Sequence, residues 1–269
     1  MTDLPTNITA VPSRLGSRAL VDERGLVIEI DEVQPFTLHH GVVRLSVLTF
    51  IVDVSAGVTL DTDPDYWTFT TDLSLRMRAV PAPRKVTATT TIMRRGRRSA
   101  HGLVEVVDEQ DRLVAAGAIG FAHVPRKPDA PPKPQVSPEM LAARFSGRER
   151  LSSPLRDEAG IVPLDPAHGV VEIAVRPEVC NPAGTLQGAM VALVAEAAAE
   201  DLVGSMTGEP VVVTELDIRY LAQANVGPVR TQSRVLGDGP DDPVEVRLID
   251  TATDRVSTLV YARAARVSV

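Results

Sequence analysis

Two long apolar segments organise the pattern of hydrophobic and polar positions along the chain. Residues 188–204 are rich in alanine, leucine and valine, and alanine and leucine favour a helix. Residues 42–57 are rich in β-branched residues, which taken alone favours a strand. Both segments are apolar on nearly all sides, as expected of a helix that is buried against a sheet.

Short segments in which apolar and polar residues often alternate flank each apolar segment and predict strands. One strand is predicted before each segment, at residues 25–30 and 169–175. The strands predicted after the first segment cover residues 68–78, 84–95, 99–109 and 113–124. Those after the second cover residues 211–221, 229–237, 243–250 and 255–267. Turn residues separate these strands, so the pattern favours an antiparallel meander in each half.

The two halves align in one constant register, which indicates an internal duplication. A shift of 143 positions, the difference between residue numbers 53 and 196, places Glu196 on Asp53 and Gly184 on Gly41. The alternative is a chance similarity between two valine-rich halves. The duplication predicts that residues 42–57 form a helix despite their β-branched composition, because the matching segment is rich in alanine.

A proline-rich segment at residues 125–138 separates the halves and predicts an extended linker, because proline fixes its backbone and lacks an amide donor. Residues 139–150 favour a short helix. The expected organisation is a first domain over residues 1–125, a linker with a short helix over 126–150, and a second domain over 151–269.

Composition and charge narrow the classes of function. The chain has 269 residues, 3% aromatic residues and a net charge of −7, which argues against a nucleic-acid partner. A single cysteine, Cys180, cannot form an internal disulfide or a cysteine-rich metal site. No segment is apolar over the ~18 residues that a membrane span needs, and the N-terminus lacks the apolar core of a signal peptide. We therefore expect a cytoplasmic protein without a membrane span.

The sequence NPAGTLQGAMVALVAE, residues 181–196, resembles the signature of hotdog-fold thioesterases of the phenylacetate-degradation and 4-hydroxybenzoyl-CoA type. Asn181, Gly184, Gly188 and Glu196 occupy matching positions, whereas Gln187 stands where the family has histidine and alanine follows Gly188 in place of a second glycine. The resemblance implies an α+β chain with two hotdog folds side by side. In each of them an antiparallel sheet wraps around a central helix.

In such proteins the active site lies between two hotdogs, so the resemblance implies residues drawn from both halves. Asp53 is expected to act as the nucleophile or as the base that activates water. Asn181 would orient water or the thioester, and the amide of Gly188 would polarise the thioester carbonyl at a helix N-terminus. Thr71 matches a supporting hydroxyl, and Gln187 is expected to contact substrate.

The equivalent second site would contain Glu196 and Thr214, but the residues opposite them have changed. Leu38, Arg44 and Leu45 stand where the first site has Asn181, Gln187 and Gly188. The amide side chain and the glycine are therefore both lost. We expect one working site and a degenerate second one.

A structural alternative exists for each expected catalytic residue, and for Thr71, as for Thr214, it is that of an ordinary threonine in a β-strand. Asp53 could form an ion pair with Arg44 or Arg76, since an unpaired charge is costly in an apolar segment. Asn181 precedes a proline and could serve a turn, and Gly188 could permit close helix packing.

His39 and His40 offer a competing chemistry, because hotdog dehydratases and hydratases pair a histidine before the central helix with a carboxylate across the interface. Either histidine could face Glu196 in the second site. The alternative is a histidine pair at the surface or in a turn.

The strongest basic cluster could hold the phosphates of coenzyme A, or it could be a solvated hairpin tip. It consists of Arg94, Arg95, Arg97 and Arg98, with Arg84 and Lys85 nearby in the sequence.

The sequence thus favours hydrolysis of an acyl-CoA thioester to free acid and coenzyme A. Coenzyme A belongs to the substrate, and no metal or other cofactor is expected. A hotdog dehydratase or hydratase and a non-catalytic acyl-CoA or lipid-binding protein are the alternatives. By analogy, two chains could form a homodimer of double hotdogs.

Overall fold

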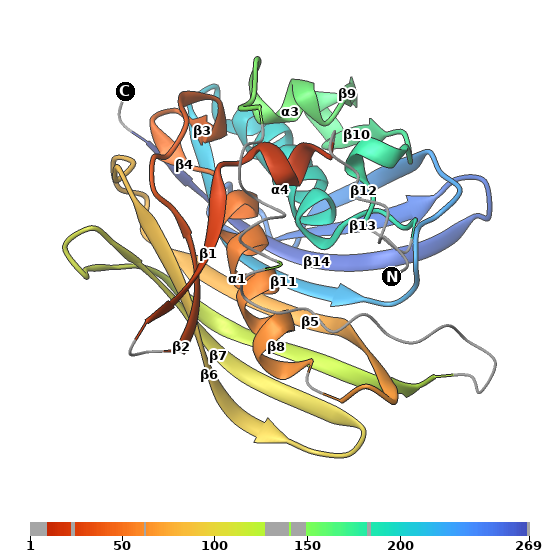
Figure 1. The fold of residues 1–269 in the computed structure, drawn as a ribbon. Coiled ribbons are helices and arrows are strands. Elements are labelled where there is room, and N and C mark those ends of the chain that lie inside the picture. The colour runs from red at the N-terminus through yellow and green to blue at the C-terminus, as the bar shows by residue number, and fades with distance from the viewer. Residues whose placement is uncertain are drawn as a thin grey trace.

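A large antiparallel sheet with two long helices on it forms the α+β fold of this protein (Figure 1). The computed structural model describes residues 10–22, 25–61, 63–126, 140, 149–181 and 184–267. The predicted linker over residues 126–150 lies almost entirely outside the described residues, so the domain boundaries stay a prediction. None of the helices within the described ranges has the length and the apolar character needed to cross a membrane.

The first half of the chain contributes eight strands and helix α1 (Leu45–Leu60). Its strands are β1 (Ser17–Asp22), β2 (Gly25–Ile30), β3 (Leu38–His39), β4 (Val42–Val43), β5 (Tyr66–Met77), β6 (Val86–Arg95), β7 (Ser99–Asp108) and β8 (Leu113–Pro125). Two short 3₁₀ helices, η1 (Val11–Arg14) and η2 (Pro35–Thr37), precede β1 and β3.

The second half contributes helix α4 (Gly188–Thr207), the short helix α3 (Leu155–Glu158) and six strands. These strands are β9 (Ile161–Asp165), β10 (Val170–Ile173), β11 (Val211–Tyr220), β12 (Val229–Val235), β13 (Val244–Asp250) and β14 (Arg255–Arg266). Two 3₁₀ helices, η3 (Pro166–His168) and η4 (Pro177–Val179), flank β10.

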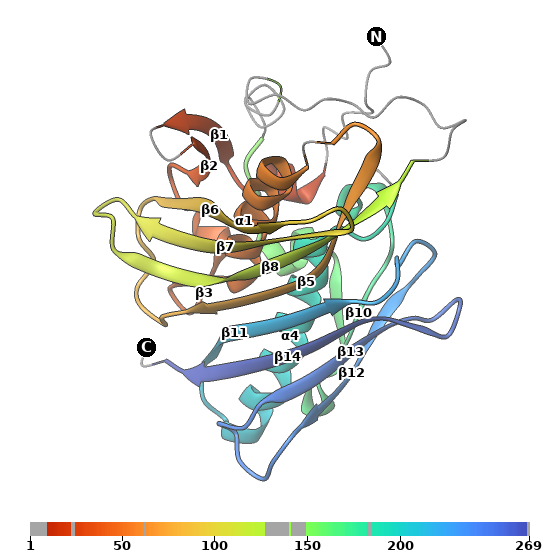
Figure 2. The ribbon, with the colours of Figure 1, turned by 90° about the horizontal axis from the view of Figure 1, so that it is seen from below.

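The strand order of the main sheet reads the same way from either edge. It runs β1-β2-β6-β7-β8-β5-β11-β14-β13-β12-β10-β9. Each of the six strands from the first half therefore has a counterpart at the mirrored place in the second half. Strands β5 and β11 pair antiparallel at the centre, where Arg76 lies opposite Glu215 and Asp72 lies opposite Arg219. Figure 2 shows these two strands adjacent between the two halves.

The predicted meanders are correct for three strands of each half but wrong for the fourth. Strands β6, β7 and β8 follow one another, and so do β12, β13 and β14. Strands β5 and β11 lie beyond β8 and β14 rather than beside β6 and β12. The helices explain the difference, because each carries the chain across the face of the sheet after the first strand and so delivers the next strand to the far side. The edge strands β1 and β9 were not predicted.

Helix α1 forms where composition alone favours a strand, and burial explains why. Val47, Leu48, Ile51 and Val52 are fully buried, since the helix packs against α4 and several strands of its own half. A helix that is apolar all round satisfies its own backbone groups inside the core.

The register of 143 positions proposed from the sequence matches the element boundaries. It places Leu45, the first residue of α1, on Gly188, the first residue of α4. It also places Met77, which ends β5, on Tyr220, which ends β11. The start of the long helix and the end of the strand that follows it therefore coincide in the two halves.

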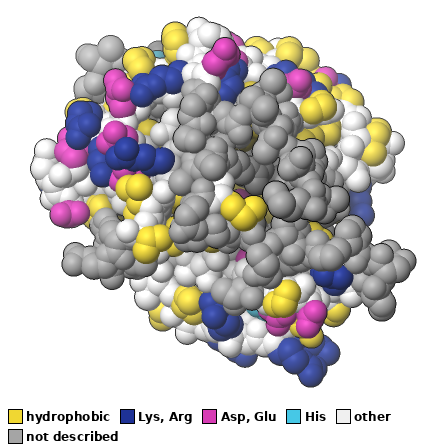
Figure 3. Space-filling model, in the orientation of Figure 1, with side chains coloured by type: hydrophobic (Ala, Val, Ile, Leu, Met, Phe, Trp, Pro, Cys, Tyr) yellow, Lys and Arg dark blue, Asp and Glu magenta, His cyan; other side chains and the backbone are white. Residues whose placement is uncertain are grey.

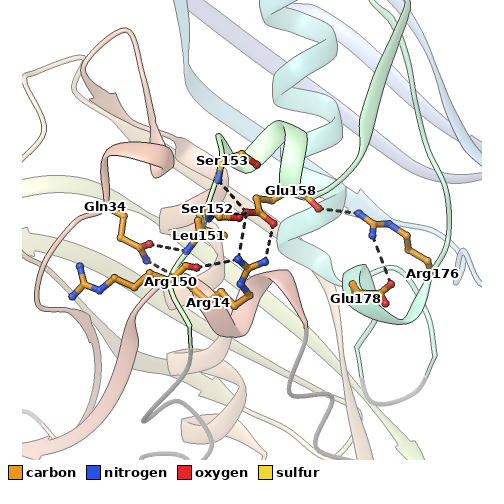
Figure 4. Close-up of polar contacts among 9 residues, drawn as sticks. All are labelled: Arg14, Gln34, Arg150, Leu151, Ser152, Ser153, Glu158, Arg176 and Glu178. Carbon is orange, nitrogen blue, oxygen red and sulfur yellow. Dashed lines mark hydrogen bonds and ion pairs between the residues drawn. The ribbon is translucent and has the colours of Figure 1, made fainter.

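A polar cluster ties the beginning of the chain to the beginning of the second half (Figure 4). Arg14 forms an ion pair of 2.7 Å with Glu158, and Glu158 also accepts hydrogen bonds of 2.7 Å from the amide and hydroxyl of Ser152. Gln34 donates to the carbonyl of Arg14 and accepts from the amide of Leu151. Burial opposes ionisation of Glu158, but the bonds from Ser152 and Arg14 outweigh it and lower its pKa to about 2.

The surface that faces the viewer of Figure 1 carries mixed charge. Basic and acidic side chains lie next to one another there, and hydrophobic side chains appear singly or in small groups (Figure 3).

Candidate functional site

A pocket of about 280 Å³ lies where the two halves meet. Four of the residues that the sequence assigned to one site, Asp53, Thr71, Asn181 and Gly188, all line it. Two come from the first half and two from the second, as the resemblance implied. The other lining residues are Phe69, Thr70, Thr185, Leu186, Val191, Tyr220, Leu221, Ala222, Gln223, Ala224 and Thr258.

Asp53 is a partly buried carboxylate on α1 that faces this pocket. Its Oδ1 accepts a hydrogen bond of 2.8 Å from the hydroxyl of Thr70. Burial raises the pKa of Asp53 and the bond from Thr70 offsets part of that rise. Arg44 and Arg76, the ion-pair partners considered from the sequence, bind other carboxylates, and among the described residues no basic side chain pairs with Asp53.

Gly188 begins helix α4 and brings the backbone close to Asp53. A Cβ atom added at Gly188 would lie 3.4 Å from Oδ2 of Asp53 and 3.1 Å from the hydroxyl of Tyr220. A larger residue would therefore crowd the hydroxyl of Tyr220 and contact the carboxylate of Asp53. Glycine keeps the pocket open at the point where the carboxylate and the helix N-terminus meet.

Gln187 is the N-cap of α4 and does not belong to the residues that line the pocket. Its Oε1 accepts from the amides of Ala189 at 2.6 Å and Met190 at 3.3 Å. In this structure Gln187 has a capping role, and its contact with substrate stays a prediction. The cap occupies the second and third amides of the helix, whereas within the described ranges the first amide, that of Gly188, has no hydrogen-bond acceptor. This amide and the positive end of the helix dipole form a donor site for a negative oxygen.

Asn181 combines the turn role and the pocket position that the sequence suggested as alternatives. Its main-chain amide donates a hydrogen bond of 2.8 Å to the carbonyl of Thr185, and its side-chain Oδ1 accepts one of 3.2 Å from the main-chain amide of Thr185. The same residue lines the pocket. The turn therefore holds the Asn181 side chain at the pocket wall.

The threonine that supports Asp53 is Thr70 rather than the predicted Thr71. Thr71 lines the pocket, but its hydroxyl donates to Asp72 at 2.8 Å. The ladder between β5 and β8 shifts register between Thr70 and Asp72. Such a bulge places two consecutive residues opposite one on the neighbouring strand, and this explains why both threonines reach the pocket.

Tyr220 lines the pocket from the end of β11 and was missed by the sequence reasoning. Its hydroxyl donates to the carbonyl of Gly188 at 3.2 Å. Burial first, and then the charge of Asp53, raises its pKa well above the usual value. The comparison of halves held no signal for it, because its counterpart is Met77.

The carboxylate of Glu196 closes the equivalent position in the other half. Its Oε1 accepts a hydrogen bond of 2.8 Å from the amide of Leu45, and its Oε2 accepts one of 2.6 Å from the hydroxyl of Ser46. Arg44 lies 3.5 Å from Oε2. Glu196 therefore serves as a cap for α1 and an ion-pair partner of Arg44. Thr214, expected beside it, donates to the carbonyl of Arg263 at 3.5 Å.

Arg44 also joins a second buried carboxylate, Glu200, at 2.9 Å. Burial raises the pKa of Glu200 to about 8, although Arg44 lowers it and Glu196 raises it further. One cation faces two carboxylates in this cluster, so a proton on Glu200 leaves the cluster neutral. Burial and the charge of Arg44 lower the pKa of His39 to about 3.

The two histidines do not face Glu196 as the competing chemistry required. Nε2 of His39 lies 3.4 Å from Glu200. His40 lies beside His39 with ring centroids 4.2 Å apart and has a φ of 47°. His39 ends β3, and His40 lies in the short turn that leads to β4.

The arginines at the tip of the β6–β7 hairpin, Arg94, Arg95, Arg97 and Arg98, are exposed. Arg95 donates to the carbonyl of Thr59. Arg84 and Lys85, which the sequence grouped with them, precede β6 and lie at its other end, about 30 Å away for a strand of this length. They bind the carbonyl of Asp31 and the carboxylate of Glu29. The predicted cluster is thus limited to the hairpin tip.

The hairpin tip lies at the same level of the sheet as the pocket. Arg94 is opposite His101, His101 is opposite Gly120, and Gly120 is opposite Asp72. These three strand spacings correspond to about 14 Å, and Asp72 adjoins the pocket residue Thr71.

Within the described part of the chain, no three or more His, Cys, Asp or Glu side chains form a group that could hold a metal ion.

Comparisons with known proteins identify the fold. Neither the protein-family models nor the curated proteins contain a match to the sequence. Solved structures do match along nearly the whole chain. A proposed thioesterase II from Thermobifida fusca has a TM-score of 0.63 and 17% identity over 96% of this chain and 99% of its own.

Two further structures show the same likeness. A tesB protein from Mycobacterium avium subspecies paratuberculosis has a TM-score of 0.60 and 13% identity, with 96% of this chain and 98% of its own covered. An acyl-ACP thioesterase from Bacteroides thetaiotaomicron has a TM-score of 0.58 and 12% identity, with 89% and 97% covered. The chain therefore has an α+β, hotdog-like fold that it shares with structures described as thioesterases.

Proposed function

We propose that this protein hydrolyses an acyl-CoA thioester to a free acid and coenzyme A, at one site between two hotdog units of the same chain. The observation that carries the proposal is that Asp53 from α1 and Gly188 at the start of α4 meet in one pocket with Asn181, while the amide of Gly188 has no acceptor among the described residues. A base and an electrophilic donor in one pocket are the two elements that acyl transfer to water requires.

The tandem arrangement is supported by the strand order and the constant register. Each unit consists of one long helix and six strands of the main sheet, with β5 as the innermost strand of the first unit and β11 as that of the second. The first unit supplies the carboxylate, and the second supplies the helix N-terminus.

In the proposed reaction Asp53 acts as a general base. It takes a proton from a water molecule while the water oxygen forms a bond to the thioester carbon. The raised pKa of this partly buried carboxylate suits the role, because a base with a pKa nearer to neutral accepts a proton more readily. The amide of Gly188 stabilises the negative oxygen, the carbon–sulfur bond then breaks, and the proton passes from Asp53 to the leaving sulfur.

A nucleophilic role for Asp53 is the variant of this mechanism that the residues also allow. Its carboxylate would displace the thiolate and form an anhydride, which water would hydrolyse. After a single turnover in water labelled with oxygen-18, the base mechanism predicts label in the product acid alone. Label in the carboxyl group of Asp53 would establish the nucleophilic route.

The alternative site for a hydratase or dehydratase receives less support. Both oxygens of Glu196 accept hydrogen bonds from α1, and His39 lies against Glu200 instead. A general acid or base in this position would first have to leave these partners.

The proposed function is tested by incubating the purified chain with a panel of acyl-CoAs of different chain length and measuring free thiol. The panel includes an enoyl-CoA, whose hydration is followed separately. Thiol release from at least one member is the expected result. Hydration without thiol release would support the hydratase, and binding without either reaction would support a binding protein.

A further inference from the structure

Tyr220 is placed to act on the same reacting atoms as Gly188. It ends β11, lines the pocket, and holds its hydroxyl 3.1 Å from the position of a Cβ atom on Gly188. Oδ2 of Asp53 lies 3.4 Å from that same position. A phenol, a carboxylate and the first peptide unit of α4 therefore converge on one small volume.

The hydrogen bond that the hydroxyl makes in this structure is a weak one. Its length of 3.2 Å to the carbonyl of Gly188 exceeds the usual length of O–H···O bonds, which is about 2.5–3.0 Å. That carbonyl also belongs to the first turn of an α-helix, where it accepts the amide four residues on. The phenol thus shares an acceptor that already has a partner, so its proton can turn to a stronger acceptor.

The hydroxyl remains a donor throughout the reaction. Burial and the neighbouring Asp53 hold the pKa of Tyr220 well above its usual value, so the phenol keeps its proton at neutral pH. A neutral phenol stabilises a developing negative oxygen by a hydrogen bond, and it needs no proton transfer to do so.

The other half of the chain lacks this hydroxyl at the position where Glu196 occupies the first amide of the helix. The counterpart of Tyr220 is Met77, and the amide that corresponds to Gly188, that of Leu45, is occupied by Glu196. The phenol is present only in the half where the helix N-terminus faces a pocket.

We propose that Tyr220 is a further catalytic residue, whose hydroxyl leaves the Gly188 carbonyl and donates to the thioester oxygen together with the Gly188 amide. The inference rests on the proposed thioester hydrolysis. The covalent steps are those given above: the bond from water oxygen to carbon forms, the carbon–sulfur bond breaks, and the proton travels from water through Asp53 to sulfur. Tyr220 neither gains nor loses a proton.

The test compares the full chain with three variants on the acyl-CoA that the wild type hydrolyses fastest. Tyr220→Phe keeps the ring and removes the hydroxyl, whereas Tyr220→Met introduces the residue of the other half. Tyr261→Phe is the matched control, because its hydroxyl lies outside the pocket and 3.5 Å from Glu245. Turnover, KM and the thermal unfolding midpoint are measured for each.

Loss of a donor to the reacting oxygen predicts a kcat about 100-fold lower for both Tyr220 variants, as for other donors of this kind. KM and the unfolding midpoint should stay close to those of the wild type, and Tyr261→Phe should leave all three quantities unchanged. An active wild type with an equally active Tyr220→Phe would overturn the role of Tyr220 alone, as would a loss seen only in KM or in the midpoint. A wild type that releases no thiol would overturn the proposed function and this inference with it.

Discussion

The main-chain amide of Leu45 donates a hydrogen bond of 2.8 Å to Oε1 of Glu196. The corresponding pair, Gly188 and Asp53, makes no such bond, and a pocket lies beside it. The glutamate side chain is longer by one methylene, about 1.5 Å. We infer that this difference in length determines whether a carboxylate covers the N-terminus of the opposite helix or leaves it free.

Lengthening the carboxylate at Asp53 should therefore close the remaining site. We expect Asp53→Glu to bring the carboxylate onto the Gly188 amide, as Glu196 reaches Leu45. Thiol release should then fall by about 10²–10³-fold, the usual effect of removing an oxyanion donor, although the base is retained. The rate is measured with the thermal midpoint, which should not fall. A variant that keeps wild-type activity would show that the reach of the side chain does not matter.

Glu196 should matter for stability through the buried charge of Arg44. Glu196→Gln removes one carboxylate from a cation that is 6% exposed and weakens the cap on α1. We expect the free energy of unfolding to drop by about 3 kcal/mol, the low end for breaking a buried ion pair. Urea unfolding measures it. The control is Glu215→Gln, which breaks the exposed pair with Arg76 and should cost less than about 1 kcal/mol. Equal losses in the two variants would contradict this account.

Glu200 should make the stability of the protein fall with rising pH. Its pKa is about 8 in the folded chain against an ordinary value of 4.5, so the folded state holds the proton more tightly than the unfolded state. The stabilisation is complete below pH 4.5 and is lost as the pH rises through about 8.

The measurement is the free energy of unfolding at pH 6.5 and pH 8.5, where His39, whose pKa is about 3, stays neutral in the folded chain. Arg44 and Glu196 are the other charged groups that face Glu200. The wild type should lose more stability over this interval than Glu200→Gln, which cannot ionise. Identical slopes in the two proteins would show that Glu200 is already ionised at pH 6.5.

The arginines at the tip of the β6–β7 hairpin should recognise the nucleotide part of the substrate. Charge reversal in Arg97→Glu with Arg98→Glu is expected to raise KM for acyl-CoA about 10-fold, because two charge-assisted contacts to phosphate are lost. KM for the matching acyl-N-acetylcysteamine, which has no nucleotide, should not change. Arg84→Glu is the control from the other end of β6. A KM that rises equally for both substrates would place the effect elsewhere than the phosphates.

The sequence predicted the two long helices and most strands, because α4 and most strands have a strong local pattern. The composition of α1 favours a strand, so this helix could be predicted only from its register with the alanine-rich α4. The sequence could not predict that β5 lies beyond β8, because the side on which a strand joins the sheet depends on how α1 crosses it.

The candidate site was predicted to the level of its segments. Asp53, Asn181 and Gly188 could be assigned to one site because their motif and register are visible in the sequence, and all three line one pocket. Which of Thr70 and Thr71 binds Asp53 depends on a β-bulge, and no residue type in this segment predicts one. The role of Tyr220 was not predicted because its counterpart is Met77. The ion pair between Arg14 and Glu158 was not predicted because its partners are 144 positions apart in the sequence.

The most direct test of the central claim is thiol release by Asp53→Asn and Glu196→Gln, measured side by side under conditions in which both variants are folded. The account places the working carboxylate on α1, so Asp53→Asn should lose nearly all of the wild-type kcat, whereas Glu196→Gln should retain most of it. Asn181→Ala should follow Asp53→Asn. An active Asp53→Asn together with an inactive, folded Glu196→Gln would contradict the account and assign the reaction to the other half.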